Sequence, residues 1–223
     1  NNVIIESIRT ELIDDGALPP KLIWPLKYHS NFEPHIISMF YDHNIDFVNY
    51  LKDYNCDNRT YDLNDGYNHS GTDIMIWPFS WYLMENEVVD VIASAEGFIT
   101  IKEDGNYDKN YSLNSDMKSN HICIQHMNGS VLCYVHLKEN SLTKLGIGDF
   151  INQGDFIGKV GSSGMSTGPH LHLEYMNKDY SIIDPFSGDC NGTISSSLWE
   201  DQKDYVDSDI IGLYTHSSTP EIY

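Results

Sequence analysis

The chain has few basic residues and no long hydrophobic run. Only 13 lysine and arginine residues stand against 33 aspartate and glutamate residues, which gives a formal charge of -20 over 223 residues. Nucleic acid and anionic membrane surfaces are recognised by clustered cations, so neither is expected as a partner. No stretch approaches the roughly 20 apolar residues of a membrane helix, which predicts a soluble chain without a membrane span. We expect it to act as a monomer.

Cysteine is also scarce, with 4 residues that form neither a dense disulfide framework nor a Cys-x-x-Cys metal knuckle. Cys123 and Cys133 flank the turn-like pair Asn128-Gly129, which predicts a hairpin. A two-residue loop there would place the two sulfurs on opposite faces, so we interpret both as buried thiols. Cys56 and Cys190 lie on either side of the expected core. A disulfide between them is left open and would require a location outside the cytoplasm.

Short alternating apolar runs, punctuated by glycine and asparagine, fill the middle of the chain. Several such runs at close spacing predict an all-β fold with an antiparallel sheet or sandwich core, and little helix. The expected organisation is an amino-terminal arm over 1–59 that wraps or precedes the core, a core over 60–187, and an irregular extension over 188–223. The runs that carry this expectation are DVIASAEGFITI, HICIQHMNGSVLCYVHL, GDFINQGDFIGKVGSSG and HLHLEYM.

The stretch GPHLHLEY, residues 168–175, places two histidines one residue apart in an expected strand. Side chains alternate along a strand, so His170, His172 and Glu174 share one face while the apolar residues between them share the other. Two neutral imidazoles that point to one place are a common way to hold a transition metal, provided that further ligands exist elsewhere.

A candidate for the further ligands is the pair His69 and Asp73. A helix would bring both side chains to one side, but Gly71-Thr72 disfavours helix, so we expect a tight turn that leads into a strand. Alone, His-x-x-x-Asp is a weak pattern with many chance occurrences. Its combination with His-x-His about a hundred residues later, and with a Tyr-Val-His-Leu run between them, is specific.

These motifs resemble, in content and in order, those of the lysostaphin-type zinc metallopeptidases, secreted or cell-envelope endopeptidases that cut peptidoglycan peptides. The resemblance covers roughly residues 60–187. Its four segments are HSGTD at 69–73, YVHL at 134–137, GDFINQGDFIGKVG at 148–161 and STGPHLHLE at 166–174.

The resemblance implies that His69, Asp73 and His172 bind Zn²⁺ and that His136 and His170 face the reacting water. It also implies a zinc endopeptidase that hydrolyses peptidoglycan stems or cross-bridges and is secreted or held in the periplasm or cell envelope. The alternatives are a non-catalytic member that binds cell wall or regulates an amidase, and a secreted zinc protease that acts on proteins. The sequence does not identify the scissile bond, nor which of His136 and His170 is the general base, nor whether the arm inhibits the site.

Several other residues are candidates for roles at or near the site. Glu174 is expected either to orient a neighbouring imidazole or to be an ordinary solvated carboxylate. His121 and His126 match no position of the resemblance, so a structural role is expected for both. The aromatic residues that could line a groove or belong to the core are Trp77, Trp81 and Tyr175.

Overall fold

A computed structural model describes residues 13–206 apart from 15, 30–32, 45, 47–49, 65 and 114–115. Within these residues the structure has ten strands and one short helix, which confirms the prediction of an all-β fold. No helix of the described residues is long and apolar enough to cross a membrane. The elements in chain order are β1 (Leu26–Tyr28), β2 (His35–Met39), β3 (Thr72–Ile76), α2 (Ser80–Glu85), β4 (Val89–Ile92), β5 (Gly97–Glu103), β6 (His121–Gln125), β7 (Val131–Val135), β8 (Phe150–Ile151), β9 (Phe156–Lys159) and β10 (His170–Met176).

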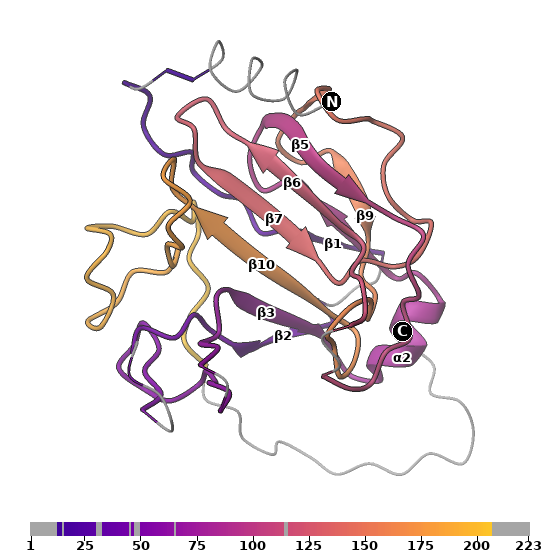
Figure 1. The fold of residues 1–223 in the computed structure, drawn as a ribbon, viewed down its shortest axis with the longest axis horizontal. Coiled ribbons are helices and arrows are strands. Elements are labelled where there is room, and N and C mark those ends of the chain that lie inside the picture. Colours follow the sequence, from indigo (N-terminus) through magenta and orange to yellow (C-terminus); the bar gives the residue numbers. More distant parts are fainter. Residues whose placement is uncertain are drawn as a thin grey trace.

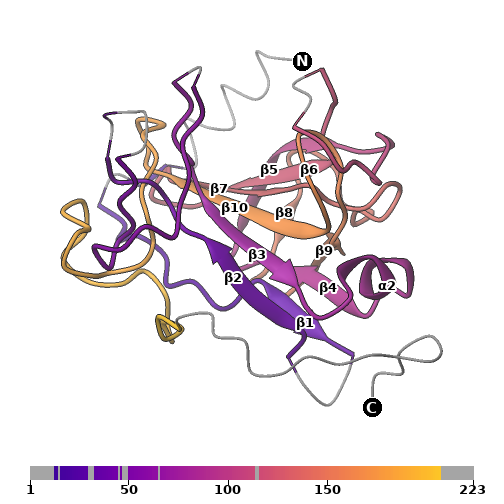
Figure 2. The same cartoon turned by 90° about the horizontal axis from the view of Figure 1, so that it is seen from below.

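The strands form a larger and a smaller antiparallel sheet. The larger sheet has seven strands in the order β2-β3-β10-β7-β6-β5-β8, and the smaller has three in the order β1-β4-β9. Figure 1 shows the smaller sheet behind the larger one, and both Figures 1 and 2 show β10 between β3 and β7. The central position of β10 places its side chains beside those of two neighbouring strands.

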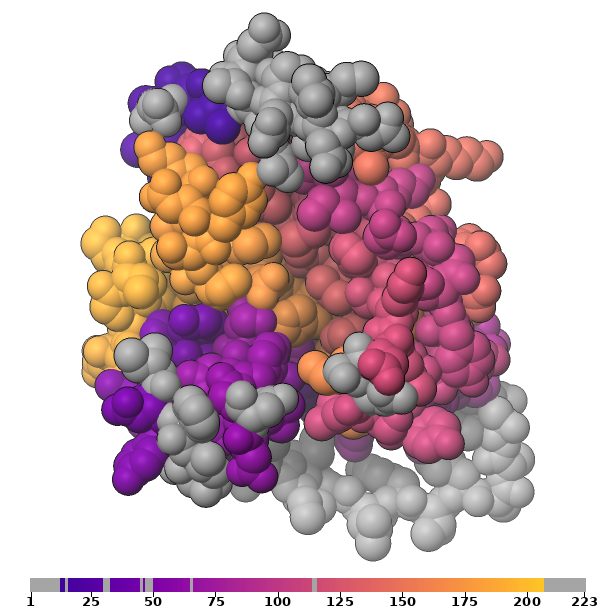
Figure 3. Space-filling model, viewed as in Figure 1, coloured from indigo at the N-terminus to yellow at the C-terminus, as the bar shows by residue number. Residues whose placement is uncertain are grey.

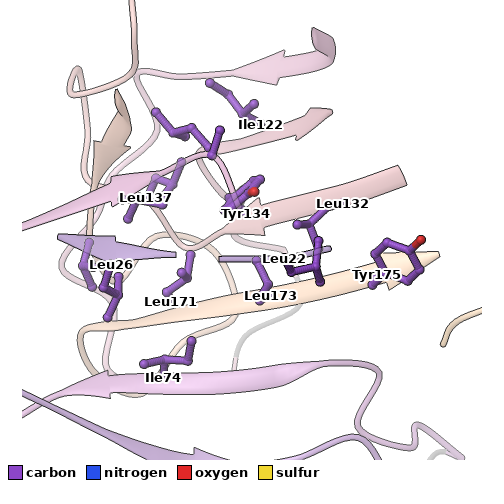
Figure 4. Close-up of a cluster of buried hydrophobic side chains, with 14 of the residues drawn as sticks. Leu22, Leu26, Ile74, Ile122, Leu132, Tyr134, Leu137, Leu171, Leu173 and Tyr175 are labelled. Atoms are coloured by element: carbon purple, nitrogen blue, oxygen red, sulfur yellow. The ribbon is translucent and has the colours of Figure 1, made fainter. Parts of the chain in front are cut away.

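The apolar face of β10 lies in the hydrophobic core. Leu171, Leu173 and Tyr175 are at most 3% exposed, and they pack in one cluster with Ile74 of β3 and Tyr134 of β7 (Figure 4). A shift of the pairing register of β10 by one residue would move these apolar side chains out of the core and the polar side chains between them into it. Each apolar side chain exposed in this way would cost about 1.5–3 kcal/mol. The core therefore fixes the register of β10, and with it the face on which its histidines lie.

Both ends of the described chain contribute to this assembly. The segment before residue 60 supplies β1, which pairs with β4, and β2, which pairs with β3. The segment after residue 187 returns to the same side: Leu22 bridges to Trp199, and a disulfide joins Cys56 to Cys190. Figure 3 shows the last described residues, in yellow, beside the violet residues near 50. The domain boundaries at 59 and 187 stay a prediction.

The expectation of buried thiols at Cys123 and Cys133 is wrong, because these residues form a disulfide. The error lies in the length of the turn. The loop runs over 126–130 and closes with a hydrogen bond from the amide of His126 to the carbonyl of Ser130. Cys123 therefore pairs directly with Cys133, whereas a two-residue loop would have shifted the register by one. Both sulfurs lie on the same face as a result.

Candidate metal centre

The strand register brings the widely separated candidate ligands together. Asp73 of β3 lies directly opposite His172 of β10, so their side chains share one face of the sheet. His69 lies outside any helix just before β3, with a bend at Gly71 between them, and its side chain reaches the same place. One donor atom from each of His69, Asp73 and His172 lies within 4.8 Å of the other two, and all three residues are buried.

The carboxylate of Asp73 is the centre of this group. Its Oδ1 lies 2.8 Å from Nδ1 of His172 and 3.2 Å from Nε2 of His69. The two ring nitrogens are themselves 3.4 Å apart. Two imidazole nitrogens and one carboxylate oxygen that face one point form a donor set suited to catalytic zinc, which takes three protein ligands and keeps one position open.

A hydrogen bond to a backbone carbonyl sets the tautomer of His69. Its Nδ1–H donates to the carbonyl oxygen of Phe40 over 2.7 Å, so Nε2 keeps the lone pair that faces Asp73. The ring stacks on Tyr61 at a centroid distance of 4.5 Å. The carbonyl of His69 accepts from the amide of Asp42. Phe40 was missed at the sequence level, since a backbone carbonyl acts there and any residue type supplies one.

Gly71 allows β10 to approach the turn that carries His69. A Cβ atom at this position would lie 2.8 Å from Cε1 of His172 and 2.5 Å from the carbonyl oxygen of Leu173. Both distances are far shorter than a van der Waals contact. Glycine is therefore required here for the two ligand-bearing segments to come together.

His136 and His170 form a second pair beside the first group. Their ring centroids lie 4.7 Å apart, and His136 lies 5.7 Å from the ring of His172. Nδ1–H of His136 donates to the carbonyl of Ser163, and Nδ1–H of His170 to that of Gly168, each over 2.7 Å. Each ring therefore keeps Nε2 as a proton acceptor, and Nε2 of His170 lies 3.6 Å from Asp73.

The backbone of His136 has a φ of 64°, in the left-handed region. This conformation is uncommon outside glycine and costs of order 1 kcal/mol or more. His136 directly follows β7, and its carbonyl accepts a hydrogen bond from the amide of Gly161. Contacts around the residue thus hold a strained backbone, which is common where a side chain has a functional role.

The charges of the group control its protonation. At Asp73 burial opposes ionisation, but the charges of His170 and His69 and the hydrogen bond from His172 outweigh it and hold the pKa well below its usual value. At His172 burial alone would lower the pKa. The hydrogen bond to Asp73 and the charge of this carboxylate outweigh burial and raise the pKa of His172. Burial, followed by the charges of His170 and His172, lowers the pKa of His136 well below its usual value. His136 is therefore neutral near pH 7.

The remaining candidates lie in different environments. Glu174 is half-buried on the face of the histidines, where its charge contributes to the raised pKa of His172. His126 is 3% exposed and donates to the carbonyl of Glu96 over 2.7 Å, in line with a structural role. Tyr175 belongs to the core, whereas Trp77 and Trp81 are 52% and 40% exposed around the start of α2.

The antiparallel sheet and the buried group of two histidines and an aspartate define a candidate metalloprotein. The profile described as Peptidase family M23 matches residues 68–185, more than half of the chain, and the chain belongs to this family. The resemblance to lysostaphin-type peptidases is thereby confirmed.

Three similar proteins illustrate the relationship. The DD-carboxypeptidase/endopeptidase Mpg of Neisseria meningitidis serogroup B is 40% identical over 85 residues, which are 38% of this chain and 16% of that protein. The peptidoglycan DD-endopeptidase ShyC of Vibrio cholerae is 31% identical over 99 residues, which are 44% of this chain and 22% of that one. The catalytic domain of lysostaphin from Staphylococcus simulans is 26% identical, with a TM-score of 0.40 over 56% of this chain and 83% of that one. The chain thus spans less than a quarter of the length of the first two relatives.

Proposed function

We propose that this protein is a zinc-dependent endopeptidase that hydrolyses peptide bonds in peptidoglycan stems or cross-bridges. The observation that carries the proposal is the group of His69, Asp73 and His172, with His136 and His170 beside it. Membership of Peptidase family M23 supports peptide hydrolysis, as does the relative named a DD-carboxypeptidase/endopeptidase. The relative named a peptidoglycan DD-endopeptidase supports the substrate.

The three ligand residues fit Zn²⁺ by their donor atoms, two ring nitrogens and one carboxylate oxygen. The hydrogen bond from Nδ1–H of His69 to the carbonyl of Phe40 leaves Nε2 of the ring to face the group, and the low pKa of Asp73 keeps this carboxylate ionised. Zinc, when bound by such a set, acts as a Lewis acid and lowers the pKa of a coordinated water to about 7. His172 would offer Nδ1, the nitrogen that faces Asp73.

His136 and His170 are assigned the proton transfers. Attack of water on the scissile carbonyl forms a carbon–oxygen bond, and Nε2 of one ring accepts the proton that the water loses. The second ring donates a hydrogen bond to the oxyanion when it is protonated. Breakage of the carbon–nitrogen bond then returns a proton to the leaving amine. The backbone carbonyls of Ser163 and Gly168 hold both rings in the orientation that these steps need.

The two disulfides support a location outside the cytoplasm. Cys56–Cys190 and Cys123–Cys133 account for all cysteines of the chain. Disulfides persist in oxidising compartments such as the periplasm and the exterior. An enzyme that acts on cell wall has to reach the same compartments, so we assign the protein to the cell envelope or the secreted fraction.

The test is digestion of purified peptidoglycan together with measurement of bound zinc. The unmodified protein should release soluble peptides and new amino groups. His172→Ala should lose zinc and activity together, whereas His136→Ala and His170→Ala should keep zinc and lose activity by a factor of about 10²–10⁴. His121→Ala is the matched control, since this histidine lies outside the group, and it should keep both properties.

Two outcomes would contradict the proposal. The first is full zinc occupancy without cleavage of any wall preparation. The protein would then be a wall-binding or amidase-regulating member of the family, or a protease with protein substrates. Digestion of casein would identify the protease. Equal rates for His170→Ala and the unmodified protein would remove His170 from the reaction.

A further inference from the structure

A buried carboxylate next to His69 has one oxygen without a partner. Asp42 is 2% exposed. Its Oδ1 accepts hydrogen bonds from the amides of Asn44 and Lys52, at 3.0 and 3.1 Å, but its Oδ2 has no hydrogen-bond partner. A buried carboxylate oxygen without a donor is costly, and such an oxygen calls for a cation or an ordered water.

A second oxygen in the same state belongs to Asn68. The amide nitrogen of this side chain donates to the carbonyl of Asn44 over 2.7 Å, which fixes the orientation of the amide. Its Oδ1 is buried and has no hydrogen-bond partner. The carbonyl and the amide of one residue, Asn44, thus hold the side chains of Asn68 and Asp42, respectively, so the two free oxygens belong to one neighbourhood.

A second carboxylate lies beside Asn68. Asp62 and Asn68 are directly opposite each other in an antiparallel bridge. The backbone hydrogen bonds on either side join His69 to Tyr61 and Leu63 to Tyr67. Asp62 and Asn68 are therefore a non-hydrogen-bonded pair, the arrangement in which opposite side chains approach most closely. The side chain of Asp62 therefore lies next to that of Asn68.

The segments that carry the two carboxylates lie on either side of the segment that carries Asn68. The amide of His69 donates to the carbonyl of Tyr61, the residue before Asp62, over 3.0 Å. The amide of Asp42 donates to the carbonyl of His69, the residue after Asn68, over 2.9 Å. The backbone thus brings together the three segments that carry two carboxylates and an amide oxygen.

We infer that Asp42, Asp62 and Asn68 form a binding site for a hard divalent cation of the Ca²⁺ class, separate from the group at Asp73. All three offer oxygen, the donor that Ca²⁺ prefers, whereas zinc and its relatives favour nitrogen and sulfur. Backbone carbonyls and water would complete the six to eight oxygens that Ca²⁺ takes.

Such a cation would join two segments that enclose His69. Residues 40–44 supply the carbonyl that holds the His69 ring, and residues 61–68 lead directly into it. Cation binding between them would stabilise this turn. The inferred consequence is a gain in thermal stability and a tighter hold on zinc when Ca²⁺ is present.

The experiment is calorimetric titration of CaCl₂ into the full chain, freed of Ca²⁺ on a chelating resin and then reloaded with one equivalent of zinc. We expect one Ca²⁺ per chain with a Kd of about 0.1–1 mM, the range of extracellular modules, and a melting temperature that rises with CaCl₂. Asp62→Asn should weaken binding at least about tenfold. Asp179→Asn is the matched control, since this aspartate is exposed and outside the site.

The titration measures Ca²⁺ binding and no hydrolysis. A failure of the Ca²⁺ inference is therefore distinguishable from a failure of the proposed peptidase function. His172→Ala should still bind Ca²⁺, which would separate the two sites. Asp42→Asn tests the buried ligand and requires a folded variant, whereas Asp62→Asn changes a less buried residue. Absence of Ca²⁺ binding to the zinc-loaded protein would overturn the inference, and so would unchanged Ca²⁺ affinity in Asp62→Asn.

Discussion

The disulfide between Cys56 and Cys190 should stabilise the folded chain more than the disulfide between Cys123 and Cys133 does. It joins residues 134 positions apart, whereas the Cys123–Cys133 bridge spans 10. A cross-link stabilises mainly by removing conformations from the unfolded chain, and the effect grows with the logarithm of the loop. For 134 residues the chain-entropy estimate is about 5 kcal/mol, compared with about 3 kcal/mol for 10.

The perturbation is Cys56→Ser with Cys190→Ser, singly and together. We expect the double variant to lose about 5 kcal/mol of unfolding free energy, measured by guanidinium titration without reductant. Each single variant already breaks the bridge, so each should lose nearly as much as the double variant. Cys56 is exposed and Cys190 half-buried, which keeps losses from packing small.

The pattern of the three variants decides the question. If the losses of the two single variants add up to that of the double variant, the cysteines act through separate local contacts and the cross-link reasoning is refuted. A double variant within about 1 kcal/mol of the unmodified protein would refute it as well, because the loop-closure effect would then be missing.

Two further predictions concern the turn before β3 and the edge strand β2. Gly71→Ala should weaken zinc binding at least about tenfold, because the new methyl would displace His172. Gly192→Ala is the control, since open space surrounds this glycine, and it should leave zinc binding unchanged. Competition with a chromogenic chelator measures the zinc affinity of both variants. His35, whose pKa burial lowers to about 4, accepts a hydrogen bond from Tyr28, so the folded protein binds fewer protons than the unfolded chain between about pH 4 and 6.5. Acidification through that window should cost about 2 kcal/mol after allowance for partial exposure, and His35→Phe should remove this pH dependence of the melting temperature.

The arrangement of the histidines on β10 was predictable from its sequence alone. Leu171 and Leu173 alternate with His170 and His172, and burial of the leucines leaves the imidazoles on the other face. The meeting of His172 with Asp73 rests on the pairing of β10 with β3, which alternation does not supply. The order of the family motifs supplied that link.

Other features depend on information that a single sequence does not contain. The disulfide of Cys123 with Cys133 turns on a one-residue difference in loop register, and Asn128-Gly129 equally allows the shorter loop. The hydrogen bond that orients His69 is accepted by the backbone carbonyl of Phe40. Every residue type has a backbone carbonyl, so the sequence does not indicate this contact. The pairing of β2 with β3 is likewise a long-range contact that local patterns do not specify.

The most direct test of the zinc peptidase account is a titration of the metal-free protein with zinc while peptide release from peptidoglycan is followed. Activity should be absent at first, rise in proportion to added zinc and stop rising at one equivalent per chain. His172→Ala should stay inactive throughout the titration. Cleavage that persists without metal, or a fully zinc-loaded protein that leaves peptide bonds intact, would contradict the assignment of His69, Asp73 and His172 as the ligands of a catalytic metal.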